Sequence, residues 1–269
     1  LLDEAQIPGL LTSRTRCIMP VHLYGNACNM EAIMKLALEN QLKVVEDAAQ
    51  AHGAIEPNSG ERIGCHGDAV AFSFYPTKNL GAMGEAGGVA CRDTALADRI
   101  NSLRNYGRNA EDGSINDLAG TNARGDEVQA AFLSSKLRSL NQINQRRREL
   151  TSLYRRGIEN ESLPVRMINY DHKSSAPHLA ILHCHSPADR DPLMQHLRNS
   201  GIDTAIHYRV ACHQQPCVQA AKKDIVISGS TETQAQCIAK SILSLPMSEC
   251  HSEEEVATVT KAIRQFFKR

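Results

Sequence analysis

The sequence predicts an α/β protein with a large domain on a mostly parallel sheet and a smaller α+β C-terminal domain. In the first part of the chain, short apolar runs that end at glycine or polar residues alternate with stretches of helical periodicity. Such alternation is typical of parallel-rich sheets. The 269 residues suffice for one large or two modest domains. Because the pattern changes after a long helical stretch, we place the large domain at residues 1–157 and the small domain at 158–269.

The large domain is expected to contain four strands and two early helices. The strands are predicted at Arg16–Gly25, Leu42–Asp47, Asp68–Phe74 and Gly87–Cys91. A helix with Asn29 as its N-cap is expected after the first strand. A second helix, from Asp93 to Tyr106, follows the last strand and is expected to end at Gly107.

An almost unbroken helical signal runs from Asp126 to Arg156. Its apolar residues recur in threes and fours. This length exceeds that of most globular helices, which predicts a helix that ends the large domain and enters the next one. The basic run Arg146–Arg148 within it is interpreted as a solvated face.

The small domain is predicted from its helix caps and apolar runs. Ser186 is an expected N-cap, with Pro187 at the first helical position and Gly201 as the stop. Ser252 and Glu255 form an expected capping box for the last helix. Strands are predicted at about 178–183, 202–208 and 242–245.

Composition excludes several classes of protein. Thirty basic residues balance thirty acidic ones, which argues against a nucleic-acid-binding protein. No apolar stretch approaches a membrane span, and the start has no signal-peptide pattern. Nine cysteines occur without a CxxC pair. We therefore expect reduced thiols in a cytoplasmic protein, and no metal site.

Polar side chains follow three of the predicted strands. Asp47 ends one strand, Lys78 lies just beyond another, and His22 and Tyr24 lie at the end of the first. Ligands bind outside the carboxyl ends of strands in open α/β sheets. A lysine beside glycines is by itself usually a solvated charge, so a reactive role for Lys78 requires partners.

Pyridoxal phosphate (PLP) is the cofactor that most often uses such a lysine. Schiff-base chemistry requires the neutral amine, and PLP needs an acidic partner for its ring nitrogen. Asp47 suits that partner, and Ser73 could donate to a phosphate oxygen. Glycines after Lys78 would let the backbone approach a ligand closely.

Three blocks of sequence carry a resemblance to a known family. They are "VVEDAAQAHGA" (44–54), "GDAVAFSFYPTKNLGAMGEAGG" (67–88) and "GTNARGDEVQAA" (120–131). The chain resembles the DegT/DnrJ/EryC1/StrS family of PLP-dependent sugar aminotransferases, which have the fold type I architecture. The resemblance covers essentially the whole sequence. It also implies a substantial segment before Arg14 that this sequence does not contain, so the large domain is expected to be N-terminally incomplete.

The resemblance implies roles for individual residues. Lys78 would form the Schiff base with PLP and shuttle protons, and Asp47 would pair with the pyridine nitrogen. Gln50 would lie against the ring or its 3′ oxygen, Ser73 would hold the phosphate, and Asn122 would reach the cofactor of a neighbouring subunit in a homodimer. The candidates for contact with substrate, whose roles the resemblance does not assign, are His22, Tyr24, His52, His207 and Tyr208.

The implied reaction moves an amino group from L-glutamate to a nucleotide-linked keto-6-deoxy sugar. The stretch "KNLGAMGE" after the lysine resembles members that act on 3-keto sugars, so these are favoured over 4-keto sugars. A second hypothesis stays open. The chain could be a catalytically inactive truncated or split member that acts at most as an interaction partner.

Overall fold

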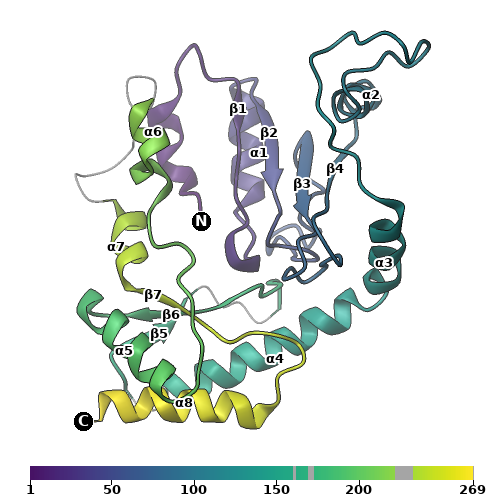
Figure 1. Cartoon of the computed structure of the whole chain (residues 1–269). Helices are drawn as coiled ribbons and strands as arrows, with labels where there is room; N and C mark the ends of the chain where they lie inside the picture. Colours follow the sequence, from purple (N-terminus) through teal and green to yellow (C-terminus); the bar gives the residue numbers. More distant parts are fainter. Residues whose placement is uncertain (160–161, 169–172, 222–232, 269) are drawn as a thin grey trace. The chain divides into compact units, whose positions relative to one another are not determined.

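The computed structural model describes residues 1–159, 162–168, 173–221 and 233–268 (Figure 1). The chain divides into two compact units. The first unit comprises Leu1–Glu4 and Arg14–Gln142, and the second comprises Ala5–Ser13 and Ile143–Arg269. The division falls within α4 (Leu140–Glu159), and the predicted domain boundary at residue 157 stays a prediction.

The first unit is built on a four-stranded sheet in the order β1-β2-β3-β4. Its strands are β1 (Cys17–Ile18), β2 (Lys43–Asp47), β3 (Ala69–Ser73) and β4 (Gly87–Cys91). The pairs β1–β2 and β2–β3 are parallel, while β3 and β4 are antiparallel neighbours (Figure 1). The predicted α/β fold with a mostly parallel sheet is confirmed.

The predicted first strand is longer than the observed one. Pro20 lacks the N–H that a ladder needs, and regular pairing stops before it. The chain then turns through the 3₁₀ helix Leu23–Gly25, where Tyr24 has a φ of 60°. An isolated bridge still joins Val21 to Asp47 at the end of β2.

Helices α1 (Met30–Glu39) and α2 (Thr94–Leu103) begin where the sequence predicts them. Their N-caps, Asn29 and Asp93, each accept a backbone N–H with the side-chain oxygen. Helix α2 ends before the predicted Tyr106, and the prediction of that end was wrong. The carbonyls of Leu103 and of the C-cap Arg104 accept N–H groups from residues 121 and 123 instead of continuing the helical ladder.

The expected long helix is two helices, α3 (Glu127–Leu137) and α4, separated by a turn at Arg138 and Ser139. The interpretation of the basic run as a solvated face was wrong for Arg147, which is 4% exposed. Its guanidinium binds Glu249 at 2.9 Å and the carbonyl of His178 at 3.1 Å. A buried guanidinium requires such partners.

The second unit has an antiparallel sheet in the order β5-β6-β7. Its strands are β5 (Val165–Met167), β6 (Ala180–Cys184) and β7 (Ile242–Leu245), and its further helices are α5 (Pro187–Asn199), α6 (Pro216–Ala220), α7 (Gln234–Ser241) and α8 (Glu253–Phe267). The caps at Ser186 and Ser252 are confirmed, including the capping box with Glu255. The predicted strand at 202–208 is absent; only Ala205 bridges to Ser244 of β7.

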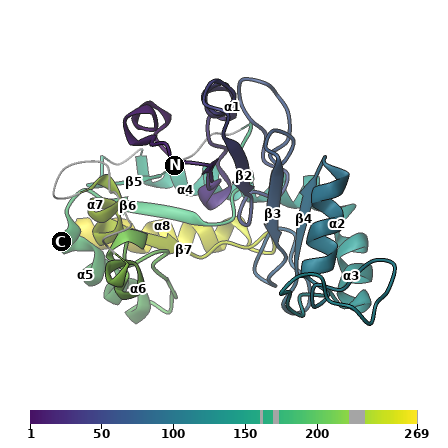
Figure 2. The same ribbon diagram turned by 90° about the horizontal axis from the view of Figure 1, so that it is seen from above.

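One hydrophobic cluster holds the second unit together. Helices α4, α5 and α8 contribute Tyr154, Leu193, Leu197, Val256 and Ile263, which pack with residues of all three strands. Figures 1 and 2 label these helices and strands. Burial of these side chains stabilises the unit by roughly 1.5–3 kcal/mol each. Within the described part of the chain, no helix is long and apolar enough to cross a membrane.

Candidate active site

The carboxyl ends of two adjacent parallel strands lie at the candidate site. Asp47 is the last residue of β2 and pairs in register with Ala71 of β3, and β3 ends at Ser73. Asp47 Oδ1 accepts the N–H of Ala49 at 3.0 Å, which orients the carboxylate. Ser73 Oγ accepts the N–H of Tyr75 at 3.4 Å, so its own hydrogen can be donated. The carboxylate of Asp47 and the hydroxyl of Ser73 therefore lie at the same edge of the sheet, where its parallel strands end.

A tight turn after β3 carries Lys78. Its backbone N–H donates to the carbonyl of Tyr75 at 2.9 Å, and the N–H of Ala82 returns to the carbonyl of Phe74 at 2.8 Å. The side chain of Lys78 is partly buried, and this burial lowers the pKa of its amine. The negative charge of Asp47 acts in the opposite direction and moderates the shift. The two groups are therefore electrostatically coupled.

Gly81 permits this turn to close. A Cβ at this position would meet the carbonyl oxygen of Pro76 at 2.3 Å and that of Tyr75 at 2.8 Å. Because both are backbone atoms, they cannot move aside without opening the turn.

We expect Gly81→Ala to lower the free energy of unfolding by at least about 2 kcal/mol. It should also weaken cofactor binding, since the turn that bears Lys78 must shift. Thermal unfolding and a PLP titration would measure both effects. The matched control is Gly113→Ala, because a Cβ at Gly113 has no atom within 4 Å. Equal melting temperatures for the two variants would contradict the prediction.

Gln50 and Tyr24 contact each other. The N–H of Tyr24 donates to Gln50 Oε1 at 2.8 Å, and both residues are 7% exposed. Gln50 lies three residues beyond Asp47, at the same end of β2. The structure thus brings two predicted site residues into direct contact, although one precedes α1 in the sequence and the other follows it.

His52 lies beside the aromatic side chains of β3 and its continuation. Its ring centroid is 5.7 Å from that of Phe72 and 5.8 Å from that of Phe74. Burial lowers the pKa of His52 to about 4, and the positive charge of Lys78 adds to this effect. A neutral imidazole is therefore near enough to Lys78 to interact with its charge.

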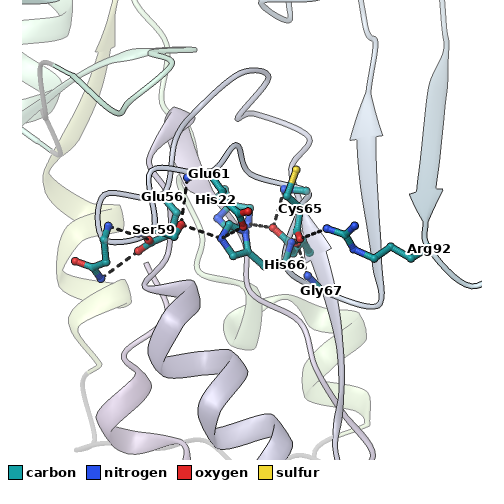
Figure 3. Close-up of polar contacts among 11 residues, drawn as sticks. His22, Glu56, Ser59, Glu61, Cys65, His66, Gly67 and Arg92 are labelled. Atoms are coloured by element: carbon teal, nitrogen blue, oxygen red, sulfur yellow. Dashed lines mark hydrogen bonds and ion pairs between the residues drawn. The ribbon is translucent and has the colours of Figure 1, made fainter.

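Glu46 is a buried residue that the sequence analysis did not single out. Its carboxylate accepts His22 Nε2 at 3.1 Å and the N–H groups of Gly64, His66 and Gly67 at 2.9, 3.1 and 2.7 Å. Figure 3 shows His22 beside the loop that carries His66 and Gly67. Burial opposes ionisation, but the bond from His22 and the backbone bonds from Gly67 and Gly64 lower the pKa of Glu46 to about 2. A charged residue in an apolar strand is the signal that could have identified it.

His22 is fully buried and bound to other groups of the protein. Its Nε2 lies against Glu46, and its Nδ1 accepts the N–H of Cys28 at 3.0 Å. Its contact with substrate stays a prediction, and these bonds favour a structural role for the ring.

Each of the remaining candidates makes contacts within its own unit. Asn122 is exposed and bridges to Asn105 in the first unit. His207 and Tyr208 belong to the second unit, where His207 Nδ1 lies 2.9 Å from Ser244 Oγ and Tyr208 is 53% exposed. Their roles stay predictions.

Two further observations bear on ligands. Among the described residues, no group of three or more His, Cys, Asp or Glu side chains could hold a metal ion. A pocket of about 690 Å³ lies along β4 and α2, but none of the predicted site residues lines it. The reactive groups gather at the strand ends and not in that pocket.

Comparison with known proteins adds a family and several relatives. The DegT/DnrJ/EryC1/StrS aminotransferase family matches residues 1–264. The chain is 40% identical over 265 residues to the erythromycin biosynthesis sensory transduction protein EryC1 of Saccharopolyspora erythraea, with 98% of this chain and 69% of the relative covered. It is 39% identical to the dTDP-3-amino-3,6-dideoxy-alpha-D-galactopyranose transaminase of Aneurinibacillus thermoaerophilus, with 98% of this chain and 69% of that protein covered.

A third relative and a solved structure come from Streptomyces venezuelae. The chain is 38% identical to its dTDP-3-amino-3,4,6-trideoxy-alpha-D-glucose transaminase, with 100% of this chain and 68% of the relative covered. The crystal structure of S. venezuelae DesV in complex with a ketimine intermediate superposes with a TM-score of 0.88 at 37% identity, over 100% of this chain and 69% of that chain.

Proposed function

The chain belongs to the DegT/DnrJ/EryC1/StrS aminotransferase family, and from this premise we propose that it transfers an amino group from L-glutamate to a nucleotide-linked 3-keto-6-deoxy sugar. The family is PLP-dependent, and its structures include complexes with the cofactor and with a ketimine intermediate. The chain is accordingly a PLP-dependent sugar aminotransferase by family. The sugar, the position aminated and the amino donor are the proposed part.

The observation that carries the proposal is the position of Asp47 near enough to Lys78 for its charge to act on the amine. PLP presents an electrophilic carbon, a ring nitrogen that must hold a proton, and a phosphate. Lys78, a partly buried amine of lowered pKa, suits the electrophilic carbon. Asp47, a carboxylate at the end of β2, suits the protonated ring nitrogen. Ser73, a hydroxyl at the end of β3, suits the phosphate. The residues present therefore suit the cofactor.

When bound, PLP supplies an electron sink for the carbanion formed at the amino-bearing carbon. The residues of the protein would bind the cofactor, orient it and move the proton. Lys78 would hold the cofactor through its Nζ and then accept and return the proton at the reacting carbon, for which a lowered pKa is suited. Asp47 would keep the ring nitrogen protonated. Gln50 would contribute hydrogen bonds from its amide, and Ser73 would hold the phosphate by its hydroxyl.

Two relatives support the choice of the 3-position. Both bear names of transaminases of 3-amino sugars, and they are 39% and 38% identical to this chain. The stretch "KNLGAMGE" after Lys78 supports the same choice. In the proposed reaction the amino group of L-glutamate and the keto oxygen of the sugar exchange places, which leaves 2-oxoglutarate.

We also propose that the chain acts as a homodimer in the cytoplasm. Exposed Asn122 would reach the cofactor of the partner subunit. All nine cysteines are free thiols, which supports a reducing compartment.

The reverse reaction provides the test. The chain with PLP is incubated with 2-oxoglutarate and either a dTDP-linked 3-amino- or a 4-amino-6-deoxyhexose, and glutamate is measured by mass spectrometry. Glutamate should form with the 3-amino sugar at least tenfold faster than with the 4-amino sugar. A faster reaction with the 4-amino sugar would overturn the assignment of the 3-position. Formation of no glutamate from either sugar would overturn the proposed activity.

A further inference from the structure

The segment from residue 22 to residue 28 is closed on itself by the ring of His22. The N–H of Cys28 donates to His22 Nδ1 at 3.0 Å, so the two ends of the segment are joined through one side chain. The thiol of Cys28 donates to the carbonyl of Val21 at 3.3 Å and reinforces the closure. Both His22 and Cys28 are 0% exposed.

The bond to Cys28 also determines the tautomer of the ring. Because Nδ1 accepts a backbone N–H, the hydrogen of the imidazole lies on Nε2, which donates to Glu46 at 3.1 Å. The other donors to Glu46 are backbone groups of residues 64–67. Figure 3 shows His22 beside this loop, with Cys65, His66 and Gly67 labelled. The ring is thereby held at both nitrogens, one bound to the 22–28 segment and one bound to β2.

The closed segment holds Tyr24 in an unusual conformation. Tyr24 has a φ of 60°, in the left-handed region that residues other than glycine adopt uncommonly. In this conformation its N–H donates to Gln50 Oε1 at 2.8 Å. The contact directs the amide of a residue that the proposed function assigns to the cofactor.

We propose that His22 is a positioning residue of the active site. It acts through the Tyr24 amide, which fixes the orientation of the Gln50 side chain. Because Oε1 accepts from Tyr24, the NH₂ group of Gln50, with its two N–H donors, is directed away from the Tyr24 amide. Such donors suit an anionic oxygen of a bound ligand and would repel none of its lone pairs. This inference rests on the proposed function, since it deepens the role of Gln50 there.

The first test needs no cofactor. Hydrogen exchange at the Tyr24 amide is compared in the wild-type chain and in His22→Ala, with Ile33→Ala as the matched control. Ile33 is 0% exposed in the same unit, so its loss removes packing but none of these bonds. We expect exchange of the Tyr24 amide to be at least about tenfold faster in His22→Ala than in Ile33→Ala. Equal exchange in the two variants would overturn the proposal.

A second variant covers the case in which His22→Ala does not fold. Asparagine can place its side-chain oxygen near the position of Nδ1 and keep an acceptor for the Cys28 amide. His22→Asn is therefore expected to retain most of the protection of the Tyr24 amide. If His22→Asn folds and loses that protection as completely as alanine does, the bond to Cys28 is not what holds Tyr24, and the mechanism is overturned.

The third measurement uses bound PLP and separates positioning from stability. The visible absorbance of the bound cofactor is titrated with pH in the wild type, His22→Ala, Gln50→Ala and the double variant. Loss of the Gln50 donors should raise the apparent pKa of the absorbance by about one pH unit, the equivalent of one hydrogen bond. His22→Ala should produce a similar shift, and the double variant should shift no further than Gln50→Ala alone.

Additive shifts in the double variant, or no shift in His22→Ala, would overturn the proposal while leaving the aminotransferase function intact. Failure of the wild-type chain to bind PLP would contradict the proposed function instead. The exchange measurement at Tyr24 would still decide whether His22 holds the Tyr24 amide.

Discussion

Lys78→Ala is expected to reduce transamination by at least about 10³-fold and to abolish the covalent visible band that PLP forms with the chain. In the proposed function Lys78 supplies both the amine that attaches the cofactor and the base that moves the proton, so one change removes both. The pKa of this amine is lowered by burial and only partly restored by the charge of Asp47. Absorbance spectra after addition of PLP, followed by the glutamate assay, would measure the two effects.

Lys43→Ala is the matched control for this experiment. Lys43 is an exposed lysine of the same unit that binds Asp68 at 2.7 Å, and this ion pair raises the pKa of its amine. It should react poorly with the aldehyde, and its loss should leave the band unchanged. A band of wild-type intensity in Lys78→Ala would show that another amine carries the cofactor, which would contradict the assignment of Lys78.

Glu46→Gln is expected to lower the free energy of unfolding by about 3–5 kcal/mol. Each carboxylate oxygen accepts two donors: Oε2 from His22 and Gly64, and Oε1 from His66 and Gly67. A glutamine must turn its NH₂ group toward one of these pairs and leave buried donors unsatisfied. Urea denaturation at neutral pH would measure the loss.

The same carboxylate predicts a dependence on acid. The folded-state pKa of Glu46 is about 2, whereas its ordinary value is 4.5. Because folding lowers this pKa, the ionised carboxylate stabilises the folded state, and this stabilisation is fully present above pH 4.5. It is lost as the pH falls from 4.5 toward 2 and the carboxylate becomes protonated. We expect about 3 kcal/mol of stability to be lost in that window by the wild type beyond what Glu46→Gln loses. Denaturation midpoints at several pH values would measure the difference.

Glu61→Gln is the control for the Glu46 prediction. Glu61 shortly precedes the loop residues 64–67 that bind Glu46, but its side chain is 61% exposed and makes one long contact, at 3.7 Å, with His66 Nε2. Its replacement should change stability by less than about 1 kcal/mol. Parallel pH dependences for wild type and Glu46→Gln between pH 5 and 2 would refute a lowered pKa for Glu46.

Local sequence predicted many of the elements correctly. Caps such as Asn29, Ser186 and Ser252 were identified because the cap and its helix are adjacent in the chain and their bonds are local. Strands β2, β3, β4 and β7 were identified from apolar runs. The prediction of a strand at 202–208 was wrong, since this segment forms only one isolated bridge to β7, between Ala205 and Ser244.

Predictions failed where a distant segment competes for the same group. At the end of α2, the carbonyls of Leu103 and Arg104 accept N–H groups of residues 121 and 123. Arg147 reads as part of a basic surface run, yet Glu249 and the carbonyl of His178 hold it inside the second unit. No local pattern contains those partners.

The sequence by itself determined the family and the placement of Asp47, Ser73 and Lys78 at strand ends and in the turn after a strand. Strand ends and turns depend on residues that are neighbours in the sequence, so local patterns predict them. Only the tertiary structure decided that Glu46 is the buried partner of His22, and that the Tyr24 amide orients Gln50. These contacts join residues more than twenty positions apart. Hydrogen bonds over such separations depend on how strands and loops meet in space, which periodicity and composition do not specify.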